Sequence, residues 1–214
     1  MRSAFDHALD NHELRAAAQA HASRYGQRGS EAYRLAWLRF RHEVQTIDDL
    51  RNRRLGHTER SADVVEVLNG AVARAMAIDG APMGHAHLVE PRTRALRMVL
   101  HSGFTTDFVD FFGVTDDSAS AMALATGQPV WVPDVMRSTV FADTPALAIM
   151  LGAGSRAVAS LPLTSRRGAT LAIISTHHKR RRGWTNDRRL ELEGLARSTA
   201  RMLDRAIDAG DSVV

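Results

Sequence analysis

The stretch from Val99 to His178 decides the fold, because strand and helix signals alternate along it in a definite order. It contains VLHSGF (99–104), DDSASAMALATGQPVWVPDV (116–135), RSTVFAD (137–143), AGSRAVASLPLTS (153–165) and LAIISTHH (171–178). Two apolar runs, Ala157–Leu163 and Thr170–His177, flank the turn residues Ser165–Gly168. Apolar runs bounded by turn signals are typical of buried strands. We therefore expect two central strands joined by a hairpin.

Weaker signals on both sides of this pair complete a mixed α+β pattern. Alternating residues predict strands at 83–90, 94–101 and 129–132, with Pro-Arg-Thr (91–93) as a hairpin turn. Helical periodicity predicts three short and two long helices, which are 106–112, 118–126, 139–151, 64–78 with Ser61 as N-cap, and 186–207. The two long helices should pack beside each other.

The composition sets limits on location and chemistry. Of the 214 residues 44% are hydrophobic, enough for a proper core, and no cysteine is present. Disulfides, thiolate metal sites, thioether-linked chromophores and cysteine redox centres are therefore excluded. No apolar run is long enough to cross a bilayer, and MRSAFDHALDNHEL lacks the hydrophobic core of a signal peptide. We expect a cytoplasmic location and no membrane partner.

Several motifs together resemble a GAF domain across residues 60–207. They are the glycine-closed strand VLHSG, the Gly-Gln-Pro hairpin at 127–129, and the paired strands SLPL (160–163) and STH (175–177). The resemblance implies a central antiparallel sheet of five or six strands with helices on both faces. It also implies a bacterial sensor module with a small-ligand pocket. GAF-like enzymes that reduce methionine sulfoxide use cysteines, so we expect no enzyme here.

Residues 1–57 are predicted to form a helical extension that precedes a GAF-like domain at 58–214. Within the extension, Glu31–Leu55 carries apolar residues at helical spacing. Such an amphipathic helix needs a partner surface, either the domain itself or a second copy of the chain. Because GAF modules commonly dimerise through helices, the resemblance favours a homodimer.

Side-chain alternation along the first strand predicts where a ligand would lie. Ala86 and Leu88 suit the helix-covered face, so His85 and His87 should point together to the opposite face. There the resemblance places the pocket, under a roof of Phe104, Phe108, Phe111, Phe112, Trp131, Phe141 and Leu147. The candidate ligand-binding residues are His85, His87, Phe108, Phe112, Trp131, Asp134, Phe141, Ser160, Ser175 and His177. The same aromatic residues could equally fill a plain core.

The histidines raise the question of a metal ion or haem, since neutral imidazoles bind both. His101 and His177 are expected near His85 and His87 on other strands. One strand cannot establish three converging ligands, and no HExxH motif occurs. Hydrogen bonding to a ligand or to water is therefore the favoured interpretation. No catalytic or metal-binding residue is assigned, and the cofactor is left unknown.

Two other motifs receive structural interpretations. Gly152–Ala157 spells GxGxxA, but it precedes an expected strand, whereas the nucleotide-binding fingerprint follows one. The run Lys179–Arg182, with Trp184 beside it, could bind phosphate and stack on a base. A single loop is a small footprint, so a solvated turn is favoured over a nucleic-acid site. An acidic protein partner stays possible for this loop.

Two classes of function follow. In the first, the domain senses a small ligand of unknown identity and signals through helices at a dimer interface. A ligand can do this only if it binds one arrangement of the helices better than another. In the second, the pocket is collapsed and the domain is a dimerisation or protein-docking scaffold.

Overall fold

The computed structural model describes residues 23–24, 60–91, 93–113 and 118–211. Most of the 1–57 extension, including the expected helix at 31–55, lies outside these residues. In the described part, five strands form one sheet with the order β2-β1-β5-β4-β3, and all paired neighbours are antiparallel. The strands are β1 (Met83–Val89), β2 (Leu96–Ser102), β3 (Val130–Val132), β4 (Ala157–Thr164) and β5 (Thr170–His178).

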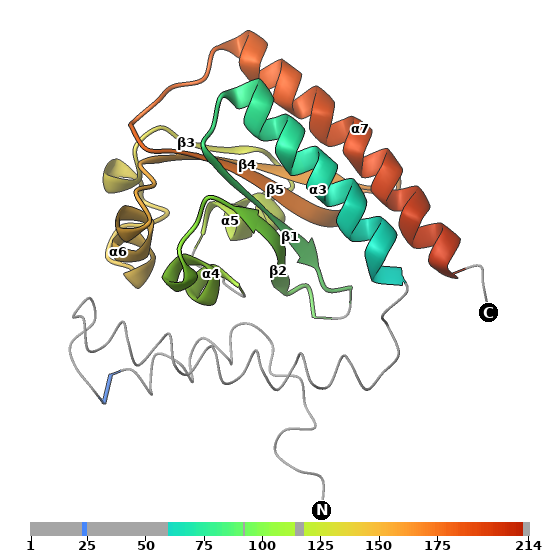
Figure 1. Ribbon diagram of the computed structural model, residues 1–214, viewed down its shortest axis with the longest axis horizontal. Coiled ribbons are helices and arrows are strands. Elements are labelled where there is room, and N and C mark those ends of the chain that lie inside the picture. The colour runs from blue at the N-terminus through green and yellow to red at the C-terminus, as the bar shows by residue number, and fades with distance from the viewer. Residues whose placement is uncertain (1–22, 25–59, 92, 114–117, 212–214) are drawn as a thin grey trace, which may run out of the picture.

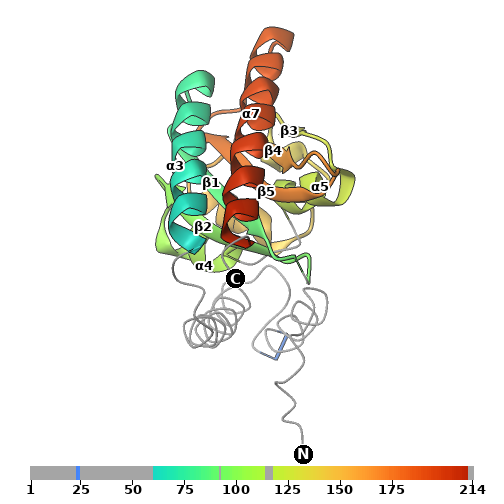
Figure 2. The same cartoon turned by 90° about the vertical axis from the view of Figure 1, so that its right-hand side faces the viewer.

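Helices cover both faces of this sheet, as the GAF resemblance implied. The two long helices, α3 (Arg60–Asp79) and α7 (Asn186–Asp211), lie side by side on one face (Figure 1, Figure 2). The other face carries α4 (Thr106–Phe112), α5 (Ala119–Thr126), the 3₁₀ turn η1 (Val135–Arg137) and α6 (Pro145–Gly152). The fold is therefore α+β, with a long helix pair opposite a layer of short helices.

Strand alternation gives the two faces different cores. On β5, Ala172 and Ile174 belong to the apolar cluster beneath α3 and α7. On β1, Ala86 and Leu88 contact the same cluster, which leaves His85 and His87 on the face of the short helices. This confirms the orientation predicted for the first strand, because adjacent residues of a strand point to opposite faces.

Two helices begin well away from the predicted residues. The helix expected at 139–151 begins at Pro145, because proline has no amide hydrogen and is favoured in the first turn of a helix. Residues 138–144 form turns instead, closed by hydrogen bonds such as that from the Phe141 amide to the Ser138 carbonyl. Helix α3 begins at Arg60, so Ser61 lies inside the helix and is not its N-cap. None of the helices in the described ranges is long and apolar enough to span a membrane.

Candidate functional site

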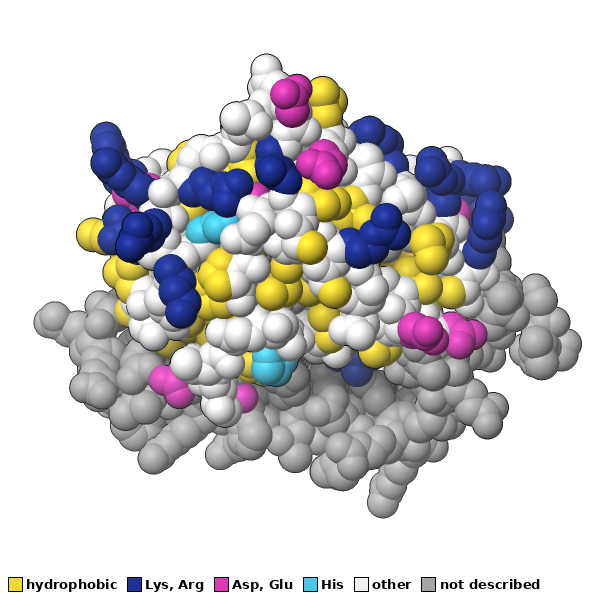
Figure 3. All heavy atoms as spheres, turned by 45° about the horizontal axis from the view of Figure 1, so that its top comes forward, with side chains coloured by type: hydrophobic (Ala, Val, Ile, Leu, Met, Phe, Trp, Pro, Cys, Tyr) yellow, Lys and Arg dark blue, Asp and Glu magenta, His cyan; other side chains and the backbone are white. Residues whose placement is uncertain are grey.

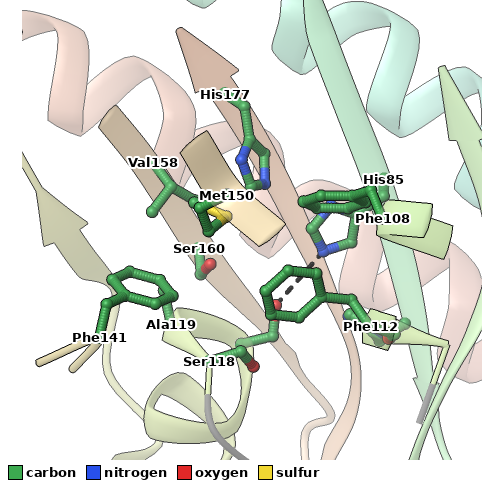
Figure 4. Close-up of a pocket in the computed structure, with 12 residues that line it drawn as sticks. His85, Phe108, Phe112, Ser118, Ala119, Phe141, Met150, Val158, Ser160 and His177 are labelled. Carbon is green, nitrogen blue, oxygen red and sulfur yellow. Dashed lines mark hydrogen bonds between the residues drawn. The ribbon is translucent and has the colours of Figure 1, made fainter. Parts of the chain in front are cut away.

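A small cavity lies between the sheet and the short helices, at the place predicted for a pocket (Figure 4). In Figure 4, Phe108 and Phe112 stand on one side of it, and Phe141, Met150 and Val158 on the other. Its volume is about 10 Å³, roughly the room that one water molecule needs. It is lined by His85, His87, Phe108, Phe112, Ser118, Ala119, Ser120, Phe141, Met150, Val158, Ser160 and His177. The expected open hollow is thus closed.

Aromatic packing is the physical reason for this closure. The rings of Phe104 and Phe108 stack with their centroids 3.8 Å apart, and the Phe104 ring also meets the edge of His177 at 4.9 Å. Phe108 continues the contact to Phe112 at 4.6 Å. Within this group of rings, Phe104 is partly exposed, whereas Phe108 and Phe112 are buried. The side chains predicted to roof a ligand therefore occupy much of its space.

Three buried imidazoles meet at the cavity. The centroid of the His85 ring lies 4.7 Å from that of His87 and 5.0 Å from that of His177. His85 and His87 are two residues apart on β1, so they share a face, and β5 pairs with β1 and brings His177 alongside them. The sequence predicted this grouping of the three histidines. His101 also lies close in register, opposite His85 on β2, but its side chain is exposed.

Each imidazole uses only one ring nitrogen for a bond to the described protein. His87 Nε2 lies 2.7 Å from the carbonyl oxygen of Phe112, and His177 Nδ1 lies 2.9 Å from Ser155 Oγ. His85 Nε2 makes a longer contact of 3.4 Å with Ser120 Oγ. The other nitrogens are buried and have no hydrogen-bond partner among the described residues; they are His85 Nδ1, His87 Nδ1 and His177 Nε2. A buried polar atom without a partner costs about 1–3 kcal/mol.

The same burial keeps the imidazoles neutral. Burial lowers the pKa of His87 to about 4, although its hydrogen bond to the Phe112 carbonyl acts in the opposite direction. Burial, aided by the nearby His178 and His87, lowers the pKa of His177 to about 3. The pKa of His85 is well below its ordinary value, again mainly through burial. At neutral pH each ring therefore offers a lone pair rather than a positive charge.

Serine hydroxyls connect the histidines to the central strands. Ser160 on β4 and Ser175 on β5 are register partners, and their Oγ atoms lie 2.8 Å apart. Ser175 Oγ continues to Ser120 Oγ at 3.2 Å, and Ser120 reaches His85. Ser175 thus belongs to the hydrogen-bonded chain behind the cavity rather than to its lining. All three hydroxyl groups are buried.

Trp131 does not belong to the cavity, and its predicted position is wrong. Val130 and Val132 of β3 pack toward the short helices, so Trp131 between them points to the opposite face. There its ring lies 5.4 Å from that of Trp184, with the Arg189 guanidinium 5.1 Å from its centroid. The sequence VWV could not reveal this, because all three residues are apolar and either face would accept them.

Asp134 also lies outside the cavity lining. Its carboxylate accepts a hydrogen bond from the Met136 amide at 3.1 Å, which caps η1, and pairs with Arg156 at 3.0 Å. Its role in the described structure is to hold the start of η1 against the segment that enters β4. Arg156 follows Gly154, which has a φ of +72°, and precedes the first residue of β4. The Gly152–Ala157 motif therefore ends a helix and starts a strand, as expected.

Sequence reasoning missed several lining residues. Ser118, Ala119 and Ser120 at the start of α5 reach the cavity, and so do Met150 of α6 and Val158 of β4. Ser118 was expected only to begin a helix, and it does cap α5 by accepting a hydrogen bond from the Ala121 amide. No periodic signal marked the others, because their approach depends on how the short helices pack. Among the described residues, no group of three His, Asp or Glu side chains is placed to hold a metal ion.

A second polar cluster lies on the opposite face of the sheet, around Asp79 at the end of α3. Its carboxylate accepts hydrogen bonds from Thr176 Oγ1 at 2.6 Å and Trp184 Nε1 at 2.9 Å, and it contacts His178 Nε2 at 2.8 Å. Arg182 donates to the Asp79 carbonyl oxygen at 2.7 Å. Although burial opposes it, the hydrogen bonds of His178 and Thr176 and the charges of His178 and Arg182 lower the pKa of Asp79.

The basic run divides between this cluster and the surface. Lys179, Arg180 and Arg181 are exposed, whereas Arg182 is half-buried against Asp79. Trp184, considered above as a stacking platform for a base, is only 6% exposed and is bonded to Asp79. On the face seen in Figure 3, Lys and Arg side chains form separate groups divided by apolar and polar surface. Trp184 is therefore not available to a nucleic acid in this arrangement.

Comparison with known proteins identifies the class of this fold. Residues 61–204 match the family described as GAF domain. Since this match covers most of the chain, the chain belongs to the GAF domain family, whose members are sensory and regulatory domains. A comparison with curated proteins found no match.

Solved structures support the same fold at low sequence identity. The chain is similar to the GAF domain/HD domain protein from Geobacter sulfurreducens (TM-score 0.55, 15% identity, 68% of this chain and 95% of that chain). It is also similar to the blue-light absorbing PixJ GAF domain from Thermosynechococcus elongatus (0.57, 13%, 73% and 94%). A third is the free methionine-R-sulfoxide reductase from Neisseria meningitidis (0.53, 19%, 86% and 93%). At these identities the likeness is one of fold alone.

Proposed function

We propose that this GAF domain is a regulatory module that responds to a small molecule. The molecule would bind in the cavity described above, which is lined by His85, His87 and His177. The observation that carries the proposal is the set of three buried imidazole nitrogens without a partner among the described residues. A domain used only as a scaffold would gain stability from apolar residues at these positions, because unpartnered buried polar atoms are unfavourable. A ligand that supplies the missing hydrogen bonds would offset this loss of stability.

Strand β5 offers a route from the cavity to the long helices. His177 faces the cavity, while its neighbours Thr176 and His178 bond to Asp79 at the end of α3. A ligand that moves His177 would therefore act on the junction of α3 with the segment leading into α7. The coupling of a ligand site to a second site in proteins is commonly about 1–3 kcal/mol, and it requires that the ligand prefer one arrangement.

The closed cavity sets a condition on this proposal and supports the alternative. A volume of about 10 Å³ admits a water molecule but no metabolite. The aromatic cover, which consists of the rings of Phe104, Phe108 and Phe112, must therefore move before a ligand can enter. If the cover never moves, the domain acts as a dimerisation or docking scaffold. We also propose that the domain forms a homodimer, lies in the cytoplasm and is no enzyme. The absence of cysteine supports the last of these.

A thermal-shift panel tests the proposal. The full chain is heated with cyclic nucleotides, haem, amino acids, aromatic acids, fatty acids and neutral aromatic compounds. A ligand that binds only the folded state raises the melting temperature by mass action. A hit should also change amide hydrogen exchange in α3 and α7, which a ligand confined to the surface would leave unaltered. No shift with any compound would reject ligand sensing and favour the scaffold.

A further inference from the structure

We propose that the ligand of this cavity is a small, uncharged molecule that donates a hydrogen bond to His87 Nδ1. This inference rests on the proposed function and adds the chemical class of the ligand. It follows from three features of the cavity: the protonation of His87, the lack of charged side chains among the lining residues that the structure describes, and the arrangement of the aromatic cover.

The hydrogen bond to Phe112 determines which nitrogen of His87 is free to accept. A carbonyl oxygen can only accept, so the nitrogen 2.7 Å from it, Nε2, must carry the proton. In a neutral imidazole the other nitrogen, Nδ1, then presents a lone pair. His87 is fully buried, and Nδ1 has no partner among the described residues. A ligand with an O–H or N–H group would satisfy this atom, whereas one with acceptors alone would not.

The lining argues against a charged ligand. The described lining residues have aromatic, aliphatic, serine, methionine and histidine side chains, and none of them is Lys, Arg, Asp or Glu. A buried charge without a partner is strongly unfavourable. Arg156, which directly precedes the first residue of β4, already pairs with Asp134. An anion could bind only if an imidazole took up a proton with it, and such binding would strengthen as the pH falls.

The cover suggests the shape of the ligand and its path. Phe104 lies over His85, His177 and Phe108, with ring centroids 5.7, 4.9 and 3.8 Å away, and it is partly exposed. Moving this ring outward would free a flat space against Phe108 and the imidazoles. A small aromatic alcohol would suit that space if its ring took the place of Phe104. Its hydroxyl would then point past His85 toward His87, whose ring centroid lies 4.7 Å from that of His85.

Phenol, toluene and benzoate form a matched set of probes for the full-length chain. Phenol is neutral with a donor, toluene is neutral without one, and benzoate is charged. We expect phenol to bind at least tenfold more tightly than either of the others, as measured by calorimetry at pH 7.5. Nitrogen NMR of ¹⁵N-histidine protein should show the shift of His87 Nδ1 moving when phenol binds, as expected for a lone pair that gains a donor.

His87→Leu removes the acceptor and should lower the affinity for phenol to that for toluene. His101→Leu is the matched control, because His101 is an exposed histidine on the neighbouring strand, and its phenol affinity should be unchanged. Phe104→Ala tests the path and should increase phenol binding. If the His87→Leu variant folds poorly, the Nδ1 shift of His87 in the unaltered protein still tests whether phenol donates a hydrogen bond to this atom.

Equal binding of toluene or benzoate, phenol binding without a change at His87 Nδ1, or no binding of any probe would overturn the assigned ligand class. The proposed function fails separately. A charged compound that binds in the thermal-shift panel would leave the regulatory module intact and reject only the uncharged donor. No binding in either experiment would reject both.

Discussion

The carboxylate of Asp79 accepts a hydrogen bond from the indole nitrogen of Trp184 at 2.9 Å, which ties the end of α3 to the segment that leads into α7. Asp79 is 1% exposed, and Thr176 and His178 of β5 also bond to it. One carboxylate therefore joins the end of α3 to β5 and to the segment that follows β5, which lie about a hundred residues further along the chain. Because the Asp79 carboxylate is buried, water cannot easily take its place as the acceptor for these donors.

Asp79→Ala should lower the free energy of unfolding by about 3–5 kcal/mol, since it leaves the buried donors of Thr176 and Trp184 without their acceptor and removes the ion pair with Arg182. Urea denaturation followed by circular dichroism measures the change. Glu66→Ala is the control, because Glu66 is an exposed acid on the same helix and its loss should alter stability by less than about 0.5 kcal/mol. Equal effects of the two variants would show that the Asp79 cluster does not stabilise the fold.

The buried histidines should make the domain sensitive to mild acid. Their pKa values are lowered in the folded state, so between about pH 6.5 and 4.5 the unfolded chain binds protons that the folded chain does not. The free energy of unfolding should therefore fall as the pH decreases, by up to about 1.4 kcal/mol per pH unit for each histidine. The lowered pKa of Asp79 adds a further loss only below about pH 4. Urea midpoints at pH 7, 6 and 5 measure the slope, and equal midpoints would contradict the prediction.

His85→Leu should stabilise the domain at neutral pH by about 0.5–2 kcal/mol. The change removes a buried nitrogen without a partner among the described residues, and the side-chain hydrogen bond that it loses is the 3.4 Å contact to Ser120, which keeps its bond to Ser175. The variant should also show a smaller decrease of the free energy of unfolding between pH 7 and pH 5, because one buried histidine is gone. His87→Leu is the comparison: it gives up the 2.7 Å bond to the Phe112 carbonyl and should lose about 1 kcal/mol. Destabilisation by His85→Leu as large as that by His87→Leu would show that His85 supports the fold.

Two glycines with nearly the same backbone conformation should respond differently to alanine. Gly103 has a φ of +82° and Gly168 a φ of +83°, so both substitutions strain the backbone by about 1 kcal/mol. At Gly103 the new Cβ would also lie 2.8 Å from the Pro82 carbonyl oxygen, whereas at Gly168 no atom lies within 4 Å. Thermal unfolding should therefore show Gly103→Ala to be about 1–3 kcal/mol more harmful than Gly168→Ala. Similar losses at both sites would mean that the chain moves aside at Gly103.

The amino-acid pattern was sufficient for the order of the elements and for the faces of the first strand. Helix α4 has the predicted bounds, and the strand at 83–89 places His85 and His87 opposite Ala86 because side chains alternate strictly along a strand. The failures occur where alternation carries no information. VWV is apolar throughout, so Trp131 could face either way, and Pro145 determined the start of α6 more strongly than the apolar spacing did.

Local periodicity was enough to place His85 and His87 together on one face of a strand, since it fixes which side chains share a face, and the GAF resemblance placed the aromatic rings above that face. The stacking of Phe104 on Phe108 and the small volume of the cavity, about 10 Å³, became known from the folded arrangement. The tertiary structure also decided that Asp79 gathers Thr176, His178 and Trp184. The bonds to Asp79 join residues that are far apart along the chain. Their distances depend on how the helices pack against the sheet, which no local pattern specifies.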